Sequence, residues 1–360
     1  MRAQRYFLTL WLCGVLSVSL QAQAPSIENA DVVIQPLNGG LKPAVEALVR
    51  QASEPVWIGY RAPMIAGNSS MCCFHGGDHD GACCKGCNLE GSPGGGQGSS
   101  RTGPVQLEPS REVLVLLRAE AGALGKVRSF SSDCPLDAGG RRLYWLSGVD
   151  ARQSVDYLAE LVRGSDWSGQ QKRVASGAMA ALAHHAGAPA DAALAGFLAP
   201  QGARELRKQT AFWLCTARGA SGLEAVRKAV RNDKDAGFRK EAMFAISVSR
   251  ESAAVEELIH FARNDSSGPV RKQALFWLAQ KAGRQATAAL TEAIERDPDT
   301  QVKKHAVFAL SQLPKHEGVP LLIQVARNNA NPAVRKQAMF WLGQSDDPRA
   351  LQFFEEVLSR

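Results

Sequence analysis

The sequence predicts a mainly α-helical protein: an α-solenoid of about six helix–turn–helix repeats, preceded by a small Cys-rich α+β domain. Six segments of similar sequence begin 32 residues apart without an insertion, at Val174, Leu206, Phe238, Val270, Val302 and Val334. A second stretch with helical periodicity precedes them, as at 222–231 and 254–263. A fixed period of this length indicates helix pairs that stack on their neighbours. Residues 25–150 lack the repeat and hold six of the eight cysteines.

Composition narrows the function classes. The chain has 360 residues, of which 45% are hydrophobic and 21% charged, enough for two domains. A formal net charge of +7 is modest for this length and argues against nucleic acid as the partner. The sequence contains no nucleophile elbow, phosphate-binding loop or zinc-protease motif.

Residues 1–24 have the pattern of a secretory signal peptide. Arg2 and Arg5 form a basic start, residues 6–20 are mostly apolar, and Ala22-Gln23-Ala24 is a small-residue cleavage pattern. The apolar run is shorter than the roughly 20 residues that a membrane helix needs. We therefore expect a secreted or periplasmic protein without a transmembrane segment after cleavage.

The cysteines of the mature N-terminal part form an even cluster: Cys72, Cys73, Cys83, Cys84, Cys87 and Cys134. In an exported chain such a cluster first indicates disulfides, here with 15 possible pairings. Cys84 and Cys87 also have zinc-ligand spacing, with His75 and His79 nearby, so zinc or copper at Cys72–Cys87 is the alternative. Because the two-pair pattern of a zinc ribbon is missing, we expect disulfides and no cofactor. Cys215, within a repeat, is expected to be a buried, unreactive thiol.

The domain at 25–150 is expected to contain one helix and at least two strands. The patterns predict a helix at 41–52, strands at 56–64 and 112–117, and a third strand at 142–146. Residues 91–103 are rich in Gly and Ser and are expected to form a flexible loop.

A helical wheel separates the two faces of the second helix in each repeat. Val270, Ala274 and Leu278 fall on one stripe, which is the expected buried face. Lys272 and Phe276 lie across the helix, one turn apart. The same positions hold Lys208, Lys240, Lys304 and Lys336, and Phe212, Phe244, Phe308 and Phe340.

Two interpretations of these ten residues stay open. The phenylalanines could fill gaps between adjacent second helices, with the lysine stems covering them. They could instead form an exposed aromatic and basic track that binds a protein or peptide, in which case the lysines favour an acidic one. A further alternation, of Ala with Trp213, Trp277 and Trp341, suggests a duplicated 64-residue unit, and we expect these tryptophans in the core.

The pattern Val-Arg-Lys-Gln-Ala…Leu, as at 270–278 and 334–342, with Asp or Asn a few residues ahead, resembles the short HEAT-like repeat named after phycobilisome lyases. The resemblance covers about residues 151–360 and suggests an exported protein of bacterial type. It implies a right-handed superhelix whose second helices line a concave face. It also implies an inter-repeat ladder formed by Arg207, Arg239, Arg271 and Arg335 with Asp233, Asp265 and Asp297.

Function follows less directly, because this repeat occurs in bilin lyases, in deoxyhypusine hydroxylase and in bacterial binding proteins. The hydroxylase needs several His-Glu pairs on helices, whereas this chain has one, His316-Glu317, in an expected loop. We therefore expect an exported, non-enzymatic scaffold that binds a protein or peptide along the concave face. The alternatives are a metal- or thiol-dependent activity in the Cys cluster, and a lyase-type activity by family analogy.

Overall fold

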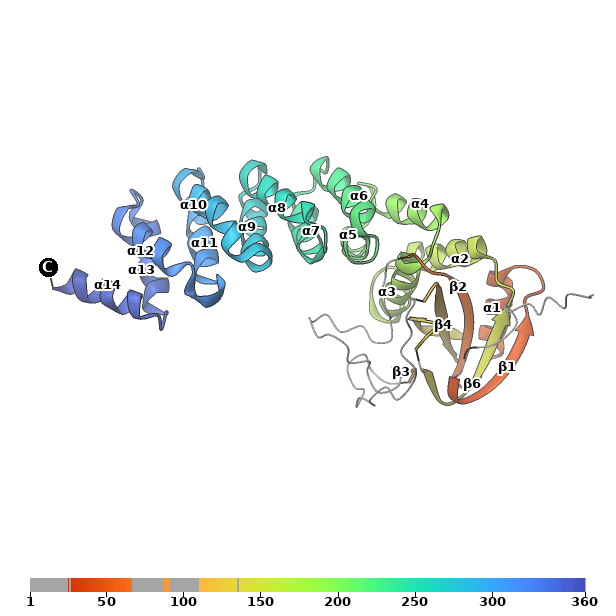
Figure 1. The fold of residues 1–360 in the computed structure, drawn as a ribbon. Coiled ribbons are helices and arrows are strands. Elements are labelled where there is room, and N and C mark those ends of the chain that lie inside the picture. Colours follow the sequence, from red (N-terminus) through yellow and green to blue (C-terminus); the bar gives the residue numbers. More distant parts are fainter. Residues whose placement is uncertain (1–24, 26, 67–86, 91–109, 135, 360) are drawn as a thin grey trace, which may run out of the picture.

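The computed structural model describes residues 25, 27–66, 87–90, 110–134 and 136–359. Its elements are a six-stranded sheet and, from residue 151 onward, a long stack of helix pairs (Figure 1). The protein is mainly helical, as the sequence predicts. Cys72, Cys73, Cys83 and Cys84, residues 1–24 and the Gly/Ser-rich stretch 91–103 lie outside the described residues.

The sheet has the strand order β1-β6-β2-β4-β5, and β3 also pairs with β6. The strands are β1 (Ile27–Pro36), β2 (Val56–Pro63), β3 (Cys87–Asn88), β4 (Glu112–Glu120), β5 (Ala123–Ser131) and β6 (Leu136–Ser147). β1 and β2 run parallel to β6, while β4 is antiparallel to both β2 and β5. The predicted strands at 56–64, 112–117 and 142–146 are confirmed, and β1, β3 and β5 were not expected.

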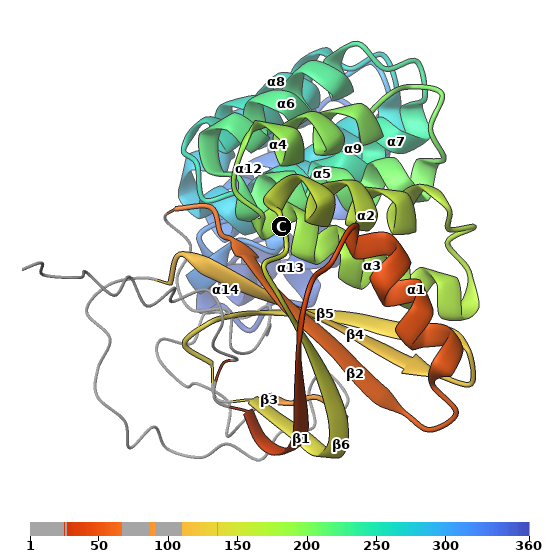
Figure 2. The same ribbon diagram turned by 90° about the vertical axis from the view of Figure 1, so that its right-hand side faces the viewer.

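Side chains alternate between the two faces of the sheet. Ile58, Tyr60 and Val115 point to one face and join the core that continues into the helices. On the other face, Trp57 and Trp145 form part of a second, smaller core. The first face is covered by α1 (Leu41–Gln51), α2 (Ala151–Arg163) and α3 (Gly169–His184), which lie on one side of the sheet (Figure 2). The predicted helix at 41–52 is therefore confirmed.

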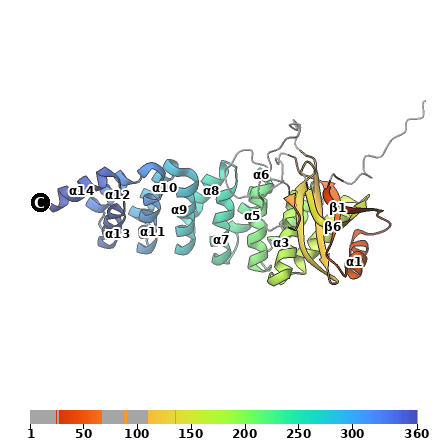
Figure 3. The same cartoon turned by 90° about the horizontal axis from the view of Figure 1, so that it is seen from below.

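The remaining helices form two rows. One row is α4 (Ala188–Phe197), α6 (Gly219–Arg231), α8 (Ala253–Asn264), α10 (Thr287–Arg296), α12 (Val319–Asn328) and α14 (Pro348–Leu358). The other row continues from α3 with α5 (Arg204–Ala217), α7 (Ala236–Val248), α9 (Gly268–Ala282), α11 (Thr300–Ser311) and α13 (Pro332–Gly343), seen side by side in Figure 3. The stack bends so that this second row lies on its inner side (Figure 1).

The start of three inner helices is fixed by an acidic or amide side chain. Asp235, Asp299 and Asn331 each accept a hydrogen bond from a backbone N–H in the first turn of α7, α11 and α13. These three caps occupy equivalent positions of their repeats, so they account for part of the Asp and Asn residues that recur ahead of the Lys and Phe positions.

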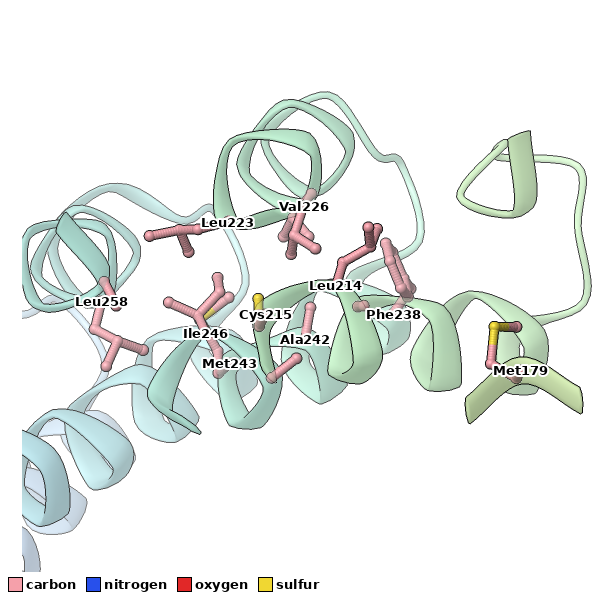
Figure 4. Close-up of a cluster of buried hydrophobic side chains, with 14 of the residues drawn as sticks. Met179, Leu214, Cys215, Leu223, Val226, Phe238, Ala242, Met243, Ile246 and Leu258 are labelled. Carbon is pink, nitrogen blue, oxygen red and sulfur yellow. The ribbon is translucent and has the colours of Figure 1, made fainter. Parts of the chain in front are cut away.

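The space between the two rows is filled by interlocking apolar side chains. Leu214 and Ile246 from the inner row meet Val226 and Leu258 from the outer row, and all four are buried (Figure 4). Phe353 of α14 is also buried, whereas Leu358 is 84% exposed, so the final helix covers the last repeat through one face only.

Cys215 lies within this apolar layer, as predicted, and is a free thiol. Burial raises the pKa of the thiol to about 12, and the nearby charge of Lys281 offsets only part of that effect. We expect no alkylation of Cys215 in the native protein at pH 8, because the reactive thiolate is nearly absent and is inaccessible. Peptide mass mapping after iodoacetamide treatment checks this, with denatured protein as the control. Modification at equal rates in both states would contradict it.

Candidate functional site

The ten predicted lysines and phenylalanines lie on α5, α7, α9, α11 and α13, and none of them is buried. Phe244 and Phe340 are 41% and 54% exposed, and the other three phenylalanines are partly exposed. The structure therefore brings all five Lys/Phe pairs together on the inner row of helices.

The rings form a continuous series across the repeats. Phe212 and Phe244 are stacked with centroids 6.0 Å apart, and Phe276 and Phe308 are stacked at 6.2 Å. Trp277 joins these two pairs, since it lies 5.0 Å from Phe244 and 4.9 Å from Phe276. We call the set the aromatic ladder; it consists of Phe212, Trp213, Phe244, Phe276, Trp277, Phe308, Phe340 and Trp341.

The tryptophans contribute more to this surface than the sequence suggested. Trp213, Trp277 and Trp341 pack against the core, as expected, but all three are also partly exposed. One side of each indole packs against the core, and the rest contacts the phenylalanines. The phenylalanines thus bridge neighbouring helices, as the first interpretation expects, and are also partly exposed, as the second requires.

The orientation of the rings determines which part of them a ligand meets. Phe244 of α7 lies between Phe212 of α5 and Trp277 of α9, and Phe308 lies between Phe276 and Trp341 in the same way. Each of these two rings is therefore stacked on one phenylalanine, while its tryptophan neighbour is tilted by 47° or 41°. Their edges carry the positive end of the aromatic quadrupole. Ligand oxygen atoms are favoured wherever such an edge is exposed.

The lysines differ in how far their charge is neutralised. Lys208 pairs with Glu205 at 2.6 Å. In the described part of the chain, Lys240, Lys272, Lys304 and Lys336 have no acidic partner within ion-pair distance. Four ammonium groups beside the aromatic ladder are thus available to a partner.

The arginines one position before these lysines have a structural role, as the resemblance implied. Arg239 binds Asp265 through two hydrogen bonds of 2.7 and 2.9 Å, and Arg271 binds Asp297 with the same lengths. Arg207 pairs with Asp233. The series of Arg–Asp pairs ends there, since Arg335 instead donates to the backbone oxygens of Asn329 and Ala330.

A hollow of about 540 Å³ opens in this face between α5, α7 and α9. Its apolar wall consists of Phe212, Phe244 and Trp277. Ala245 also lines the hollow and leaves space in it, because the neighbouring repeats have Trp at the equivalent position. Its polar lining consists of Lys208, Gln209, Lys240, Glu241 and Gln273. The equivalent positions 64 residues later keep the same residue types, except that His305 replaces Glu241.

The first inner helix, α3, has small residues at the positions that are equivalent to the Lys, Phe and Trp positions of the later inner helices. In later repeats the position of Ser176 holds Lys, that of Gly177 holds Gln, Glu or His, that of Ala180 holds Phe, and that of Ala181 alternates between Trp and Ala. Strand β5 packs there so closely that a Cβ atom on Gly177 would lie 2.1 Å from the Val127 carbonyl oxygen. Sequence reasoning missed this contact, although the run of small residues in the first aligned segment was its signal.

The histidines of the repeats lie apart from one another or are buried. His184 and His185 end α3, and burial lowers the pKa of both imidazoles. His316 lies 3.3 Å from Asp346 at the surface. Within the described ranges, no three His, Cys, Asp or Glu side chains are grouped as a metal site would require. Cys134 is buried and disulfide-bonded, and the pairing within the Cys cluster stays a prediction.

No helix in the described part of the chain is long and apolar enough to cross a bilayer.

Comparison with known proteins gives a match to the family model of HEAT repeats over residues 287–360. No curated protein matches the sequence. Among solved structures, human deoxyhypusine hydroxylase in complex with glycerol is 16% identical, with a TM-score of 0.30 over 57% of this chain and 90% of that one. YibA of Escherichia coli is 23% identical, with a TM-score of 0.33 over 47% of this chain and 64% of that one. Residues 287–360 therefore match HEAT repeats, and the preceding helix pairs have the same 32-residue period.

Proposed function

We propose that this protein is an exported, non-enzymatic scaffold that binds an extended segment of another protein along the inner row of helices. The observation that carries the proposal is the aromatic ladder, a contiguous and partly exposed apolar surface with four unpaired lysines beside it. Large contiguous apolar patches on a protein surface mark interaction sites, whereas scattered exposed apolar residues need no explanation.

The lysines and the rings have different effects in such an interface. Unpaired charges attract an oppositely charged partner over several ångströms and raise the rate of association. The rings contribute affinity, because aromatic side chains bury large areas with few rotatable bonds.

The chain itself offers a precedent for how the inner surface is used. Strand β5 packs against α3 at Gly177, and the equivalents of this residue in later repeats, such as Gln209 and Glu241, line the hollow beside the rings and lysines. An extended segment is thus a suitable shape for the inner row. The small residues of α3 let the strand approach closely, whereas Phe and Lys on the later helices keep their surface open to a partner from outside.

Export rests on the sequence alone. The basic start, the apolar run and the cleavage pattern of residues 1–24 support it. N-terminal sequencing of the protein secreted by an expressing cell is expected to begin at Pro25, and retention of residues 1–24 would contradict export.

A displayed library of random dodecapeptides tests the binding proposal. We expect the wild-type protein to enrich peptides that the triple variant Lys240→Glu, Lys272→Glu, Lys304→Glu no longer captures. The melting temperature should stay within a few degrees, because exposed charges without partners contribute little to stability.

A matched control places the same charge change elsewhere. Lys228, Lys234 and Arg250 are exposed residues outside the inner row, and their replacement by Glu should leave capture unchanged. Equal loss of peptide capture in both triple variants would mean that the net charge of the protein, and not the position of the lysines, determines binding. Failure of the wild-type protein to enrich any peptide would overturn the proposed function.

A further inference from the structure

We infer that the two ends of the inner surface differ in chemistry, so that it holds an acidic segment in one orientation. The apolar end of the segment lies in the hollow between α5, α7 and α9, and its carboxylates lie over Lys272, Lys304 and Lys336. This inference rests on the proposed function and deepens it, since it states the chemistry of the partner and its direction on the repeats.

The first support is the distribution of charge. In the N-terminal half, Glu205 neutralises Lys208, and Glu241 lines the same hollow as Lys240. The C-terminal half is different, because α9, α11 and α13 contain no Asp or Glu at all. Among the five helices that carry the Lys/Phe pairs, α9, α11 and α13 thus present a lysine of the track without an acid on the same helix, whereas α5 and α7 do not.

The second support is the chemistry of the surface between the lysines. A ring that is stacked on a neighbouring ring offers part of its positive edge to a ligand, and carboxylate oxygens are suitable partners for such edges. Rings and lysines thus favour the same kind of ligand atom. A basic or strongly cationic segment would meet repulsion over the whole C-terminal half.

The hollow supplies the anchor for the other end. Its wall of Phe212, Phe244 and Trp277 suits an aliphatic or aromatic side chain, and its volume of about 540 Å³ exceeds that of one side chain. A carboxylate is disfavoured there because Glu241 already occupies the rim. The apolar and acidic ends of the ligand are therefore assigned to different repeats.

Helix spacing sets the expected spacing within the ligand. Neighbouring helices pack about 8–10 Å apart, and an extended chain advances about 3.3 Å per residue. One repeat thus corresponds to about three residues, so we expect acidic residues at about every third position after the apolar anchor.

A single-stranded oligonucleotide is the other occupant that lysines and aromatic rings hold in proteins. Its bases need free ring faces to stack on. Phe244 and Phe308 are each stacked on another phenylalanine and have a tilted tryptophan on the other side, which leaves less free face for a base. The structure favours the acidic peptide, and oligonucleotide binding is an outcome that the test must exclude.

The chain provides matched positions for the test, because Glu241 and His305 are equivalent in the 64-residue unit. The probe is a fluorescein-labelled dodecapeptide, the glutamate peptide, with two leucines at one end and Glu at every third later position among Gly and Ser. Fluorescence anisotropy with the full chain at pH 7.5 measures its Kd. We expect His305→Glu to weaken binding at least about tenfold, since it places a carboxylate among the lysines that hold the ligand.

Two neutral substitutions serve as controls. His305→Gln and Glu241→Gln should each change Kd less than about threefold, because neither adds an acid to the C-terminal half. A glutamine version of the peptide should lose most of the affinity and all sensitivity to His305→Glu. Melting curves confirm that each variant is folded.

Several results would overturn the inference. One is an equal loss with His305→Glu and His305→Gln, which would indicate a packing role for the imidazole. Another is equal binding of the glutamate and glutamine peptides. Tighter binding of a dodecamer of deoxythymidine than of the glutamate peptide at the same salt concentration would assign the surface to nucleic acid. If the peptides enriched from the displayed library contained no acidic residues, this inference would be wrong, whereas the proposed function would still be supported.

Discussion

Replacing Asp265 with alanine is expected to lower the free energy of unfolding by about 3–5 kcal/mol, because it leaves the charge of a buried arginine unpaired. The side chain of Asp265 is 4% exposed and that of Arg239 is 11% exposed. The carboxylate binds Arg239 twice and also accepts a hydrogen bond from the Ser267 backbone. Guanidinium unfolding followed by circular dichroism measures the loss.

Two comparisons separate this effect from a general loss of charge. Truncating Arg263, whose pair with Glu292 is half exposed, should cost less than about 1 kcal/mol. Replacing both members of the buried pair, with Arg239→Met and Asp265→Leu, should recover much of the loss seen with alanine. If Asp265→Ala lowered the free energy of unfolding no more than Arg263→Ala does, the buried Arg–Asp pairs would not have the structural role described.

The same pair predicts a dependence of stability on pH. Burial alone would raise the pKa of Asp265, but the hydrogen bonds from Arg239 and the Ser267 backbone outweigh it, so the pKa is lowered from its ordinary value of 3.8. A carboxylate with a depressed pKa in the folded state stabilises the fold fully above its unfolded pKa. Its contribution is lost as pH falls below about 4 toward the depressed value. We expect the wild-type protein to lose more stability than Asp265→Ala between pH 5 and pH 3.

The second large effect is expected at the contact between the sheet and the repeats. Gly177→Ala would place a methyl group 2.1 Å from the carbonyl oxygen of Val127 and 2.7 Å from its carbonyl carbon. Both are backbone atoms of a paired strand, so β5 or α3 must move. Overpacking of this kind costs about 1–3 kcal/mol, even though alanine favours the helix. Differential scanning calorimetry of the full chain measures the shift in melting temperature.

Gly196 provides the matched control, because it also lies within a helix but has open space where a Cβ atom would be. Gly196→Ala is expected to stabilise the protein by about 0.5–1 kcal/mol. If Gly177→Ala raised stability by a similar amount, β5 would not rest on α3 as described.

The repeats were predictable because their chemistry is periodic. A fixed 32-residue spacing places Val270, Ala274 and Leu278 and their equivalents on one stripe, and the structure buries all three. The Arg–Asp ladder was implied by the resemblance to the short HEAT-like repeat, and the structure forms it at Arg207, Arg239 and Arg271. The sheet was harder, because β1 is an edge strand with mostly exposed side chains and β5 alternates weakly. Such strands depend on tertiary pairing more than on their own pattern.

The candidate site was predictable in part. The positions of the five Lys/Phe pairs could be read from the wheel, because they lie opposite the apolar stripe. Ring stacking could not, since it depends on the distance between helices and on the side-chain rotamers. The exposure of Trp277 was missed because its position on the wheel borders both the core and the surface.

The most direct test of an inner surface that binds an acidic segment in one orientation is photo-crosslinking. The glutamate peptide carries a benzophenone group at its apolar end, and mass spectrometry identifies the residues it joins. Crosslinks are expected around the hollow, on α5, α7 and α9, and they should disappear with the triple lysine variant. Crosslinks to the outer row or to the sheet, or an even distribution from α5 to α13, would contradict it.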